Sequence, residues 1–175
     1  VQDEIAEFRK RGFPLTVIGL EPGWMSRAYP CTYEWDATRF PEPGKFVNDL
    51  LQKHIRTNLW FNPGVSPECE IRDSIEPYTA SHTEWNGLVP DYRMPEARRI
   101  MLDHFKKHQL DLGVSGYKMD ENDGYDNWLW PDVATFPSGT PAEQMRQIYG
   151  SLMQRMTTDL YHDCLLYTSD AADDR

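Results

Sequence analysis

A short apolar run at residues 15–20, rich in β-branched residues and bounded by turn-forming residues, predicts a β-strand. A continuous run, in place of an alternation, is typical of a strand that is buried on both faces. Two further strands are expected at residues 57–61 and 113–119. Long loops follow the first two strands, and we expect the second loop to run to about Val89.

Segments with helical spacing of apolar residues separate these strands. A helix over residues 1–11 places Ile5 and Phe8 one turn apart among charged side chains. A second helix is expected over residues 43–54, with four apolar residues on one stripe. A third is expected over residues 95–109, because a proline stands where the first helical position would be.

The last helix has the most regular pattern. Residues 140–143, Thr-Pro-Ala-Glu, have the sequence of a capping box with proline at the first helical position. Apolar residues then recur at i, i+3, i+4, i+7, i+8 and i+11. They are Met145, Ile148, Tyr149, Leu152, Met153 and Met156. We expect this stripe to pack into the core and the helix to end at about His162.

Strands that alternate with helices predict an α/β fold, because parallel strands need crossover connections and helices supply them. An α/β barrel and an open, doubly wound sheet both fit this order. No GxGxxG or GxxxxGK[ST] motif follows a strand. The usual reason to prefer the open nucleotide-binding sheet is therefore absent.

Composition narrows the class of ligand. The formal net charge of −10 would repel a polyanion, so nucleic acid is not an expected partner. No apolar run approaches the roughly 20 residues of a membrane helix, so no membrane span is expected. Aromatic residues make up 13% of the chain, and many stand in segments rich in Gly, Pro, Asn and Asp. This distribution suits a site that stacks rings against a neutral ligand such as a sugar.

Metal and cofactor sites are not predicted. The three cysteines form no CxxC pair and no even disulfide framework. His104 and His108 stand one helical turn apart beside two lysines, which indicates a solvated helix face.

The ends of the expected strands carry most of the polar and aromatic residues, where an α/β barrel places its functional groups. Glu21 and Trp24 follow the first strand, and Trp60 lies in the second. Because side chains alternate along a strand, Lys118 and Asp120 share one face of the third. The ammonium group of Lys118 would favour the charged form of the nearby Asp120 carboxylate, so Asp120 is a candidate nucleophile. A structural salt bridge is the alternative.

Residues 116–120, Gly-Tyr-Lys-Met-Asp, resemble the nucleophile strand of glycoside hydrolase family 31, the α-glucosidase and α-xylosidase family. Three other segments resemble that family in the same order. They are residues 33–43 (Tyr-Glu-Trp-Asp-Ala-Thr-Arg-Phe-Pro-Glu-Pro), 59–63 (Leu-Trp-Phe-Asn-Pro) and 91–97 (Asp-Tyr-Arg-Met-Pro-Glu-Ala). The similarity covers nearly all of the chain before residue 164.

The resemblance implies a partial (β/α)8 TIM barrel and a retaining mechanism on α-linked glucosides, xylosides or galactosides, with Asp120 as the nucleophile. The general acid would lie beyond this chain. The resemblance also implies substrate-binding roles for further residues: Glu21 and Lys118 would bind hydroxyl groups, Trp24 and Trp60 would stack on the sugar, and Asp91 would contact it or cap a helix. No cofactor is implied.

Residues 164–175 resemble a translated sequencing adapter, so we expect residues 1–163 to be part of a catalytic barrel truncated at both ends and the remainder to be a non-native tail. Two other functions stay open. A non-catalytic relative could bind carbohydrate in the same aromatic cleft. The other possibility is a different barrel enzyme that holds a hard cation at Asp120, Glu121 and Asp123, although Lys118 would oppose a cation there.

Overall fold

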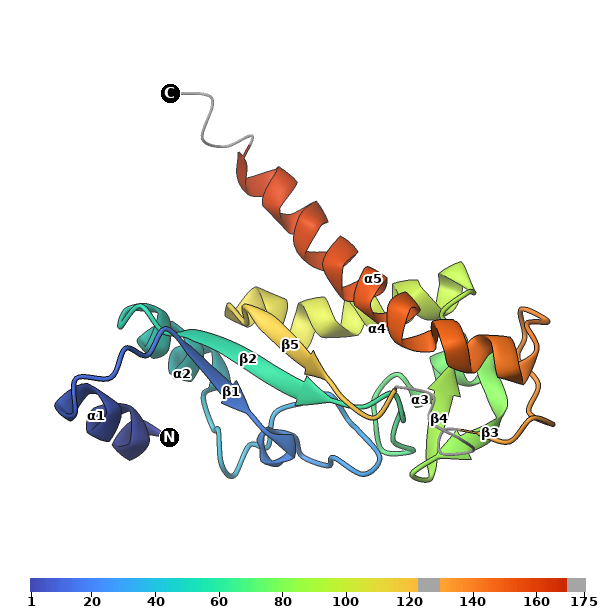
Figure 1. Cartoon of the computed structure of the whole chain (residues 1–175), viewed down its shortest axis with the longest axis horizontal. Coiled ribbons are helices and arrows are strands. Elements are labelled where there is room, and N and C mark those ends of the chain that lie inside the picture. The colour runs from blue at the N-terminus through green and yellow to red at the C-terminus, as the bar shows by residue number, and fades with distance from the viewer. Residues whose placement is uncertain (123–129, 170–175) are drawn as a thin grey trace.

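The computed structural model describes residues 1–122 and 130–169, and the side chains as far as residue 162. Figure 1 shows the arrangement of its elements. The α-helices are α1 (Gln2–Lys10), α2 (Pro43–Leu51), α3 (Arg72–Ile75), α4 (Pro95–His108) and α5 (Ala142–Ser169). The strands are β1 (Val17–Leu20), β2 (Arg56–Phe61), β3 (Thr79–Glu84), β4 (Gly87–Pro90) and β5 (Gly116–Met119). Short 3-10 helices are η1 (Pro22–Trp24), η2 (Glu76–Tyr78) and η3 (Leu110–Leu112).

Three strands form a parallel sheet in the order β1-β2-β5. Val17 lies opposite Arg56, and Asn58 lies opposite Gly116, so the three carboxyl ends meet at one edge. Helices in the crossover connections pack on this sheet, with α2 against β2 and α5 against β5. The prediction of an α/β fold with parallel strands is therefore confirmed.

The main core lies between the sheet and helices α4 and α5. Phe61 of β2, Phe105 of α4 and Tyr117 of β5 form a group of rings whose centroids lie 5.1 to 5.6 Å apart. The apolar stripe of α5 enters the same core, because Met145 and Met153 are fully buried. The prediction that this stripe packs into the core is confirmed.

An antiparallel hairpin, β3-β4, occupies part of the segment that we expected to be loop. Trp85 and Asn86 connect its strands, and both have positive φ, as a tight two-residue hairpin turn requires. The pair Asn86-Gly87 is typical of hairpin turns and could have predicted this one. The prediction failed because β3 is largely polar and lacks the alternation that marks a half-buried strand.

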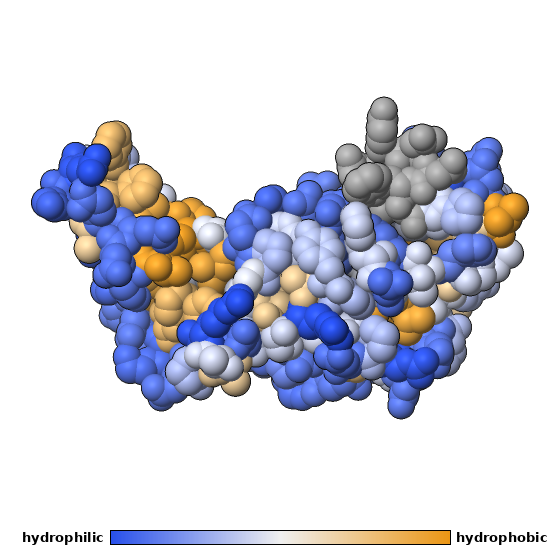
Figure 2. All heavy atoms as spheres, turned by 90° about the horizontal axis from the view of Figure 1, so that it is seen from below, coloured by the Kyte–Doolittle hydropathy of each residue, from blue (hydrophilic) through white to orange (hydrophobic). Residues whose placement is uncertain are grey.

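The expectation that the first strand is buried on both faces was wrong. Val17 is 51% exposed, and only Leu20 is fully buried in β1. Among the described residues, β1 pairs with β2 alone, while α1 packs beside it mainly through Ile5. Figure 2 shows apolar residues gathered on the surface at this end of the molecule, and Phe8 and Phe13 are among the exposed ones.

Helix α5 differs from its prediction at both ends. It begins at Ala142, and the Thr140 hydroxyl pairs with Ser138 Oγ at 2.9 Å instead of capping the first turn. The helix continues to Ser169, beyond the expected end near His162. No helix among the described residues has both the length and the hydropathy to cross a membrane.

Candidate functional site

The carboxyl edge of the parallel sheet brings four of the predicted site residues together. Trp60 of β2 lies opposite Lys118 of β5 in the strand register. Asp120 directly follows β5, and Glu21 directly follows β1. Because the strands are parallel and neighbouring, these side chains from distant parts of the chain meet at one edge.

Three neighbours hold the carboxylate of Asp120. Trp60 Nε1 donates a hydrogen bond to its Oδ2 at 2.8 Å, and the backbone N–H of Glu121 donates to its Oδ1 at 3.1 Å. Lys118 Nζ lies 3.5 Å from Oδ2. The Trp60 hydrogen bond is the largest cause that lowers the pKa of Asp120, and Glu121 N–H and Lys118 lower it further. The carboxylate is thus anionic at neutral pH, and its side chain remains 43% exposed.

Lys118 links Asp120 to Glu21. Its Nζ lies 3.1 Å from both carboxylate oxygens of Glu21, and this hydrogen bonding raises the pKa of Lys118. Lys118 and Asp120 therefore share one face of the strand, as predicted. On the other face, Tyr117 packs in the core, and Met119 Sδ accepts a hydrogen bond from Thr157.

The two predicted stacking tryptophans do not offer an open ring face. Trp60 is 2% exposed and Trp24 is 1% exposed. Trp24 Nε1 donates to the carbonyl of Trp60 at 2.7 Å, and Trp60 in turn donates to Asp120. Burying an indole requires an acceptor for its N–H, and here those acceptors lie within the site. The two buried indoles therefore form a series of hydrogen bonds that ends at the Asp120 carboxylate.

Exposed rings lie nearby instead. Tyr29 is 48% exposed and packs against Trp60 with a centroid distance of 5.4 Å. Trp85, at the tip of the β3-β4 hairpin, is 40% exposed and meets Tyr29 edge to face. Sequence reasoning missed both residues, because neither directly follows a strand of the parallel sheet.

Asp91 is separated from this group. It is fully buried after β4, which belongs to the hairpin and not to the parallel sheet. Its Oδ1 accepts the backbone N–H of Arg93 at 3.0 Å, and its Oδ2 accepts that of Ser138 at 2.8 Å. These bonds fix the loop before α4 to the loop before α5. The contact with a sugar that we expected has no support in this geometry.

Glu121 is a further residue of the site that the nucleophile prediction did not include. Its backbone has a φ of 56°, in the left-handed region that few residues other than glycine adopt. Glu121 Oε2 accepts a hydrogen bond from Asn62 Nδ2 at 3.1 Å, and Oε1 lies 3.5 Å from Tyr29 Oη. Burial and the Glu121 charge raise the pKa of Tyr29 to about 12. In the alternative cation site, Asp123 lies outside the described residues.

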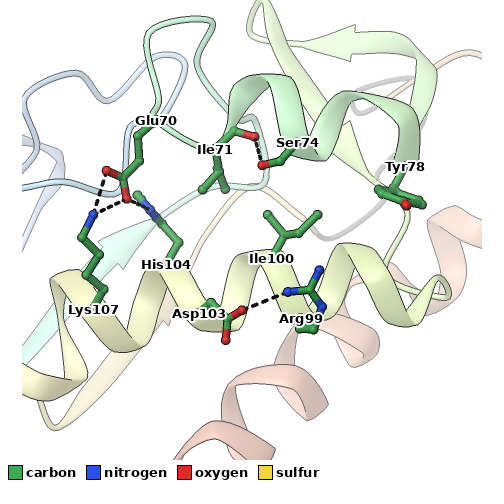
Figure 3. Close-up of a pocket in the computed structure, with 9 residues that line it drawn as sticks. All are labelled: Glu70, Ile71, Ser74, Tyr78, Arg99, Ile100, Asp103, His104 and Lys107. Carbon is green, nitrogen blue, oxygen red and sulfur yellow. Dashed lines mark hydrogen bonds and ion pairs between the residues drawn. The ribbon is translucent and has the colours of Figure 1, made fainter.

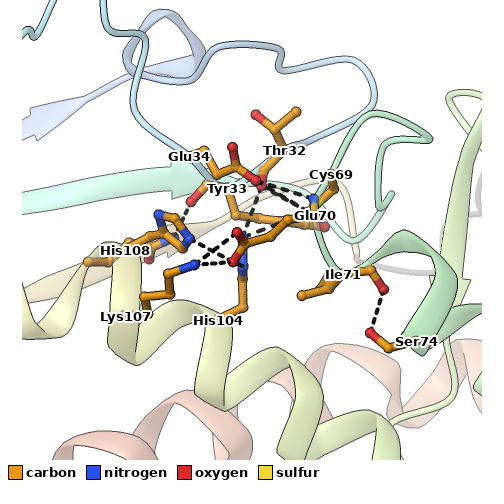
Figure 4. Close-up of polar contacts among 11 residues, drawn as sticks. Thr32, Tyr33, Glu34, Cys69, Glu70, Ile71, Ser74, His104, Lys107 and His108 are labelled. Atoms are coloured by element: carbon orange, nitrogen blue, oxygen red, sulfur yellow. Dashed lines mark hydrogen bonds and ion pairs between the residues drawn. The ribbon is translucent and has the colours of Figure 1, made fainter.

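A second group of polar residues lies where α4 meets the loops before it (Figure 4). His104 is 2% exposed, so the prediction of a solvated helix face was wrong for this residue. Its Nε2 lies 3.1 Å from the carbonyl oxygen of Thr32, and its Nδ1 lies 3.2 Å from Glu70 Oε1. Burial lowers the pKa of His104, whereas Lys107 and His108 lower the pKa of Glu70 to about 2.

Comparison with known proteins agrees with this arrangement. The sequence profile described as the glycosyl hydrolases family 31 TIM-barrel domain matches residues 1–165. An α-xylosidase of Emericella nidulans is 28% identical over 163 residues, which cover 85% of this chain and 20% of that protein. The α-xylosidase XylQ of Lactiplantibacillus pentosus is 28% identical over 120 residues, which cover 61% of this chain and 16% of that protein. The chain thus spans about a fifth of the length of these relatives.

Solved structures show the same fold. A family 31 α-xylosidase from a soil metagenome, complexed with xylose, aligns with a TM-score of 0.78 and 18% identity over 93% of this chain and 25% of that one. A family 31 sulfoquinovosidase from E. rectale aligns with a TM-score of 0.75 and 16% identity over 93% of this chain and 26% of that one. The partial TIM barrel implied by the family resemblance is confirmed by these matches. The profile match shows that the chain belongs to glycoside hydrolase family 31 and forms part of its TIM-barrel domain.

Proposed function

We propose that this chain supplies the nucleophile side of the active site of a retaining α-glycoside hydrolase, with Asp120 as the nucleophile. The main support is the environment of its carboxylate. Asp120 stands at the carboxyl end of β5, bonded by Trp60 Nε1 and Glu121 N–H and close to Lys118 Nζ. These contacts hold it anionic and oriented while it stays accessible, as a nucleophile requires.

In the proposed reaction, an oxygen of Asp120 attacks the anomeric carbon of the sugar. A C–O bond to the aspartate forms as the glycosidic C–O bond breaks, and a second carboxylic acid protonates the departing oxygen. Water then attacks the same carbon and gives its proton to the second carboxylate, while the C–O bond to Asp120 breaks and the sugar is released. In retaining enzymes the two carboxyl groups lie about 5 to 5.5 Å apart.

The neighbouring residues take positioning and binding roles in this proposal. Trp60 orients the nucleophile through its N–H, in place of the stacking role expected from the sequence. Glu21 and Lys118 offer a carboxylate and an ammonium group to sugar hydroxyls, since their side chains are 63% and 50% exposed. Tyr29 offers the exposed ring beside the nucleophile.

An α-xyloside is the substrate that we favour over an α-glucoside or an α-galactoside. The two curated relatives described above are both named α-xylosidases, at 28% identity.

Turnover of aryl α-xyloside, α-glucoside and α-galactoside by the protein that carries this segment tests the proposal. We expect Asp120→Ala to lower turnover by several orders of magnitude, because removing a nucleophile removes the covalent route. Azide should restore turnover of the variant and yield a glycosyl azide of inverted configuration, since the small anion fits the vacated volume. Asp73→Ala, at a side chain that is 91% exposed, is the control and should leave turnover unchanged.

Unchanged turnover in Asp120→Ala would contradict the nucleophile assignment. A protein that binds these sugars without hydrolysing any of them would support the carbohydrate-binding alternative.

A further inference from the structure

A thiol, an imidazole and a carboxylate converge at a buried point beside α4 (Figure 4). Cys69 is 4% exposed and His104 is 2% exposed, while Glu34 is partly exposed. The three residues come from separate parts of the chain: the loop after η1, the segment before α3, and α4 itself. Their ligand atoms all lie within 4.8 Å of one another.

The spacing of these atoms matches the edges of a tetrahedral coordination shell. Cys69 Sγ lies 3.7 Å from His104 Nε2 and 3.9 Å from Glu34 Oε1. The carbonyl oxygen of Thr32 lies 3.1 Å from both Cys69 Sγ and His104 Nε2. Bonds of about 2.0 to 2.3 Å to a tetrahedral zinc ion place neighbouring ligand atoms roughly 3.3 to 3.8 Å apart. The two distances to the Thr32 oxygen are slightly shorter than this range, and the distance from Cys69 to Glu34 is slightly longer. Small shifts of these groups would therefore bring them to coordination distance of one ion.

The hydrogen-bonding pattern of His104 also points to a cation. Its Nδ1 faces the Glu70 carboxylate, and its Nε2 faces the Thr32 carbonyl, so both ring nitrogens face acceptors. A neutral imidazole carries one N–H and can donate to only one of them. If Nδ1–H donates to Glu70, the Nε2 lone pair is left directed at the Thr32 oxygen and the Cys69 sulfur. A bound cation would turn this unfavourable contact into coordination.

Glu70 is the hydrogen-bonding partner that metal-binding histidines usually have at their second ring nitrogen. A carboxylate that accepts the second ring N–H fixes both the tautomer and the ring orientation. Lys107 Nζ holds Glu70 at 2.8 and 2.9 Å, and His108 Nε2 contacts it at 2.9 Å.

A pocket of about 420 Å³ lies beside the group, and His104 and Glu70 are among the residues that line it (Figure 3). Glu70, His104 and Lys107 lie at one end of it, and Tyr78 lies at the other.

We propose that Cys69, His104 and Glu34 bind Zn²⁺, with the carbonyl of Thr32 as the fourth ligand and Glu70 as a positioning residue. This differs from the sequence expectation that the chain has no metal site, and it does not depend on the function proposed for Asp120. A thiolate and an imidazole together favour zinc over a hard cation. Binding moves the Cys69 thiol proton to solvent and changes no oxidation state. The ion would tie the loop between η1 and α2 and the segment before α3 to α4, and so stabilise the fold.

Titration of the metal-stripped protein with Zn²⁺ and with Co²⁺ tests this site. We expect one equivalent to bind, Zn²⁺ to raise the melting temperature, and Co²⁺ to give a thiolate charge-transfer band with intense tetrahedral d–d bands. Cys69→Ser should abolish the charge-transfer band. Cys31→Ser, at another buried cysteine, and Cys164→Ser should retain it. Glu70→Gln should keep the band but weaken binding by about 10- to 100-fold.

Folding of each variant is checked by circular dichroism, and Glu34→Gln provides a second ligand variant at a partly exposed position. A protein that binds neither ion, or that keeps the thiolate band in folded Cys69→Ser, would overturn the proposal. The proposal would also be overturned if the ion binds without a thiolate band and His108→Ala abolishes this binding. That result would assign the ion to the overlapping group of Glu70, His104 and His108, which has no sulfur.

Discussion

Asp120 receives its contacts from residues that lie near and far in the sequence. Lys118 and Glu121 are close along the chain, so strand alternation could predict the first and a turn could supply the second. Trp60 is 60 positions away, and only the pairing of β2 with β5 brings its N–H to the carboxylate. The sequence could therefore predict the pairing of Asp120 with Lys118, but not the group that lowers the pKa of Asp120 most.

The pKa of Asp120 tests the role assigned to the hydrogen bond from Trp60. Trp60→Phe removes the hydrogen bond that most lowers this pKa, so we expect the pKa to rise in the variant. Because the folded-state pKa is depressed, Asp120 contributes stability above its unfolded pKa, and this contribution is lost as pH falls through the folded pKa. Trp60→Phe should reduce that acid-side loss. Carbon-13 NMR titration of the labelled carboxyl group measures the shift.

Trp35→Phe is the matched control, because its indole N–H donates to the carbonyl of His108 and not to Asp120. The control should leave the Asp120 titration unchanged. An equal pKa in Trp60→Phe and in the unmodified protein would contradict the assigned role of Trp60.

Helices were easier to predict than strands and loops. The spacing of buried residues in α4 and α5 follows the helical period closely, because each helix presents one face to the core. The β3-β4 hairpin was missed, since β3 is largely polar and the turn conformation depends on two residues with positive φ. The buried His104 was misread for a related reason, because its partner Thr32 is distant in sequence. The hydrogen bond that Asp91 accepts from Ser138 could not be predicted for the same reason.

The hairpin makes a close backbone contact that a substitution can test. A Cβ atom at Gly87 would lie 2.6 Å from the carbonyl carbon of Gly64 and 2.6 Å from Pro30 Cβ. We expect Gly87→Ala to lower the free energy of unfolding by about 1 to 3 kcal/mol, as overpacking does. Urea unfolding measures the difference. Gly19→Ala, also in a strand but with no atom within 4 Å of the added carbon, should be close to neutral. Equal stability of the two variants would show that the contact relaxes freely.

At the scale of the whole molecule, the described residues form part of a barrel with an exposed strand. The outer edge of β1 offers backbone donors and acceptors to any other strand, and Val17 beside it is half exposed. Unprotected edges of this kind promote association between chains.

This edge predicts concentration-dependent association of the chain. We expect Val17→Lys to reduce association, because a charged side chain on an edge strand disfavours the addition of another strand. Light scattering over a range of concentrations measures the effect. Val133→Lys adds the same charge at an apolar residue that is 76% exposed outside the sheet, so it controls for net charge. If both variants reduce association equally, repulsion between chains explains the change and the edge does not.

The parallel sheet also has a consequence for the kinetics of folding. Lys118 reaches Glu21 across 97 positions of sequence, and Trp60 reaches Asp120 across 60. Such non-local contacts form slowly, because the entropy of closing long loops is lost before the contacts can compensate for it. The helices can form from local interactions, but Asp120 gains its hydrogen bond from Trp60 only when β5 docks beside β2. A refolding chain would thus regain most of its helical signal before the environment of Asp120 is complete.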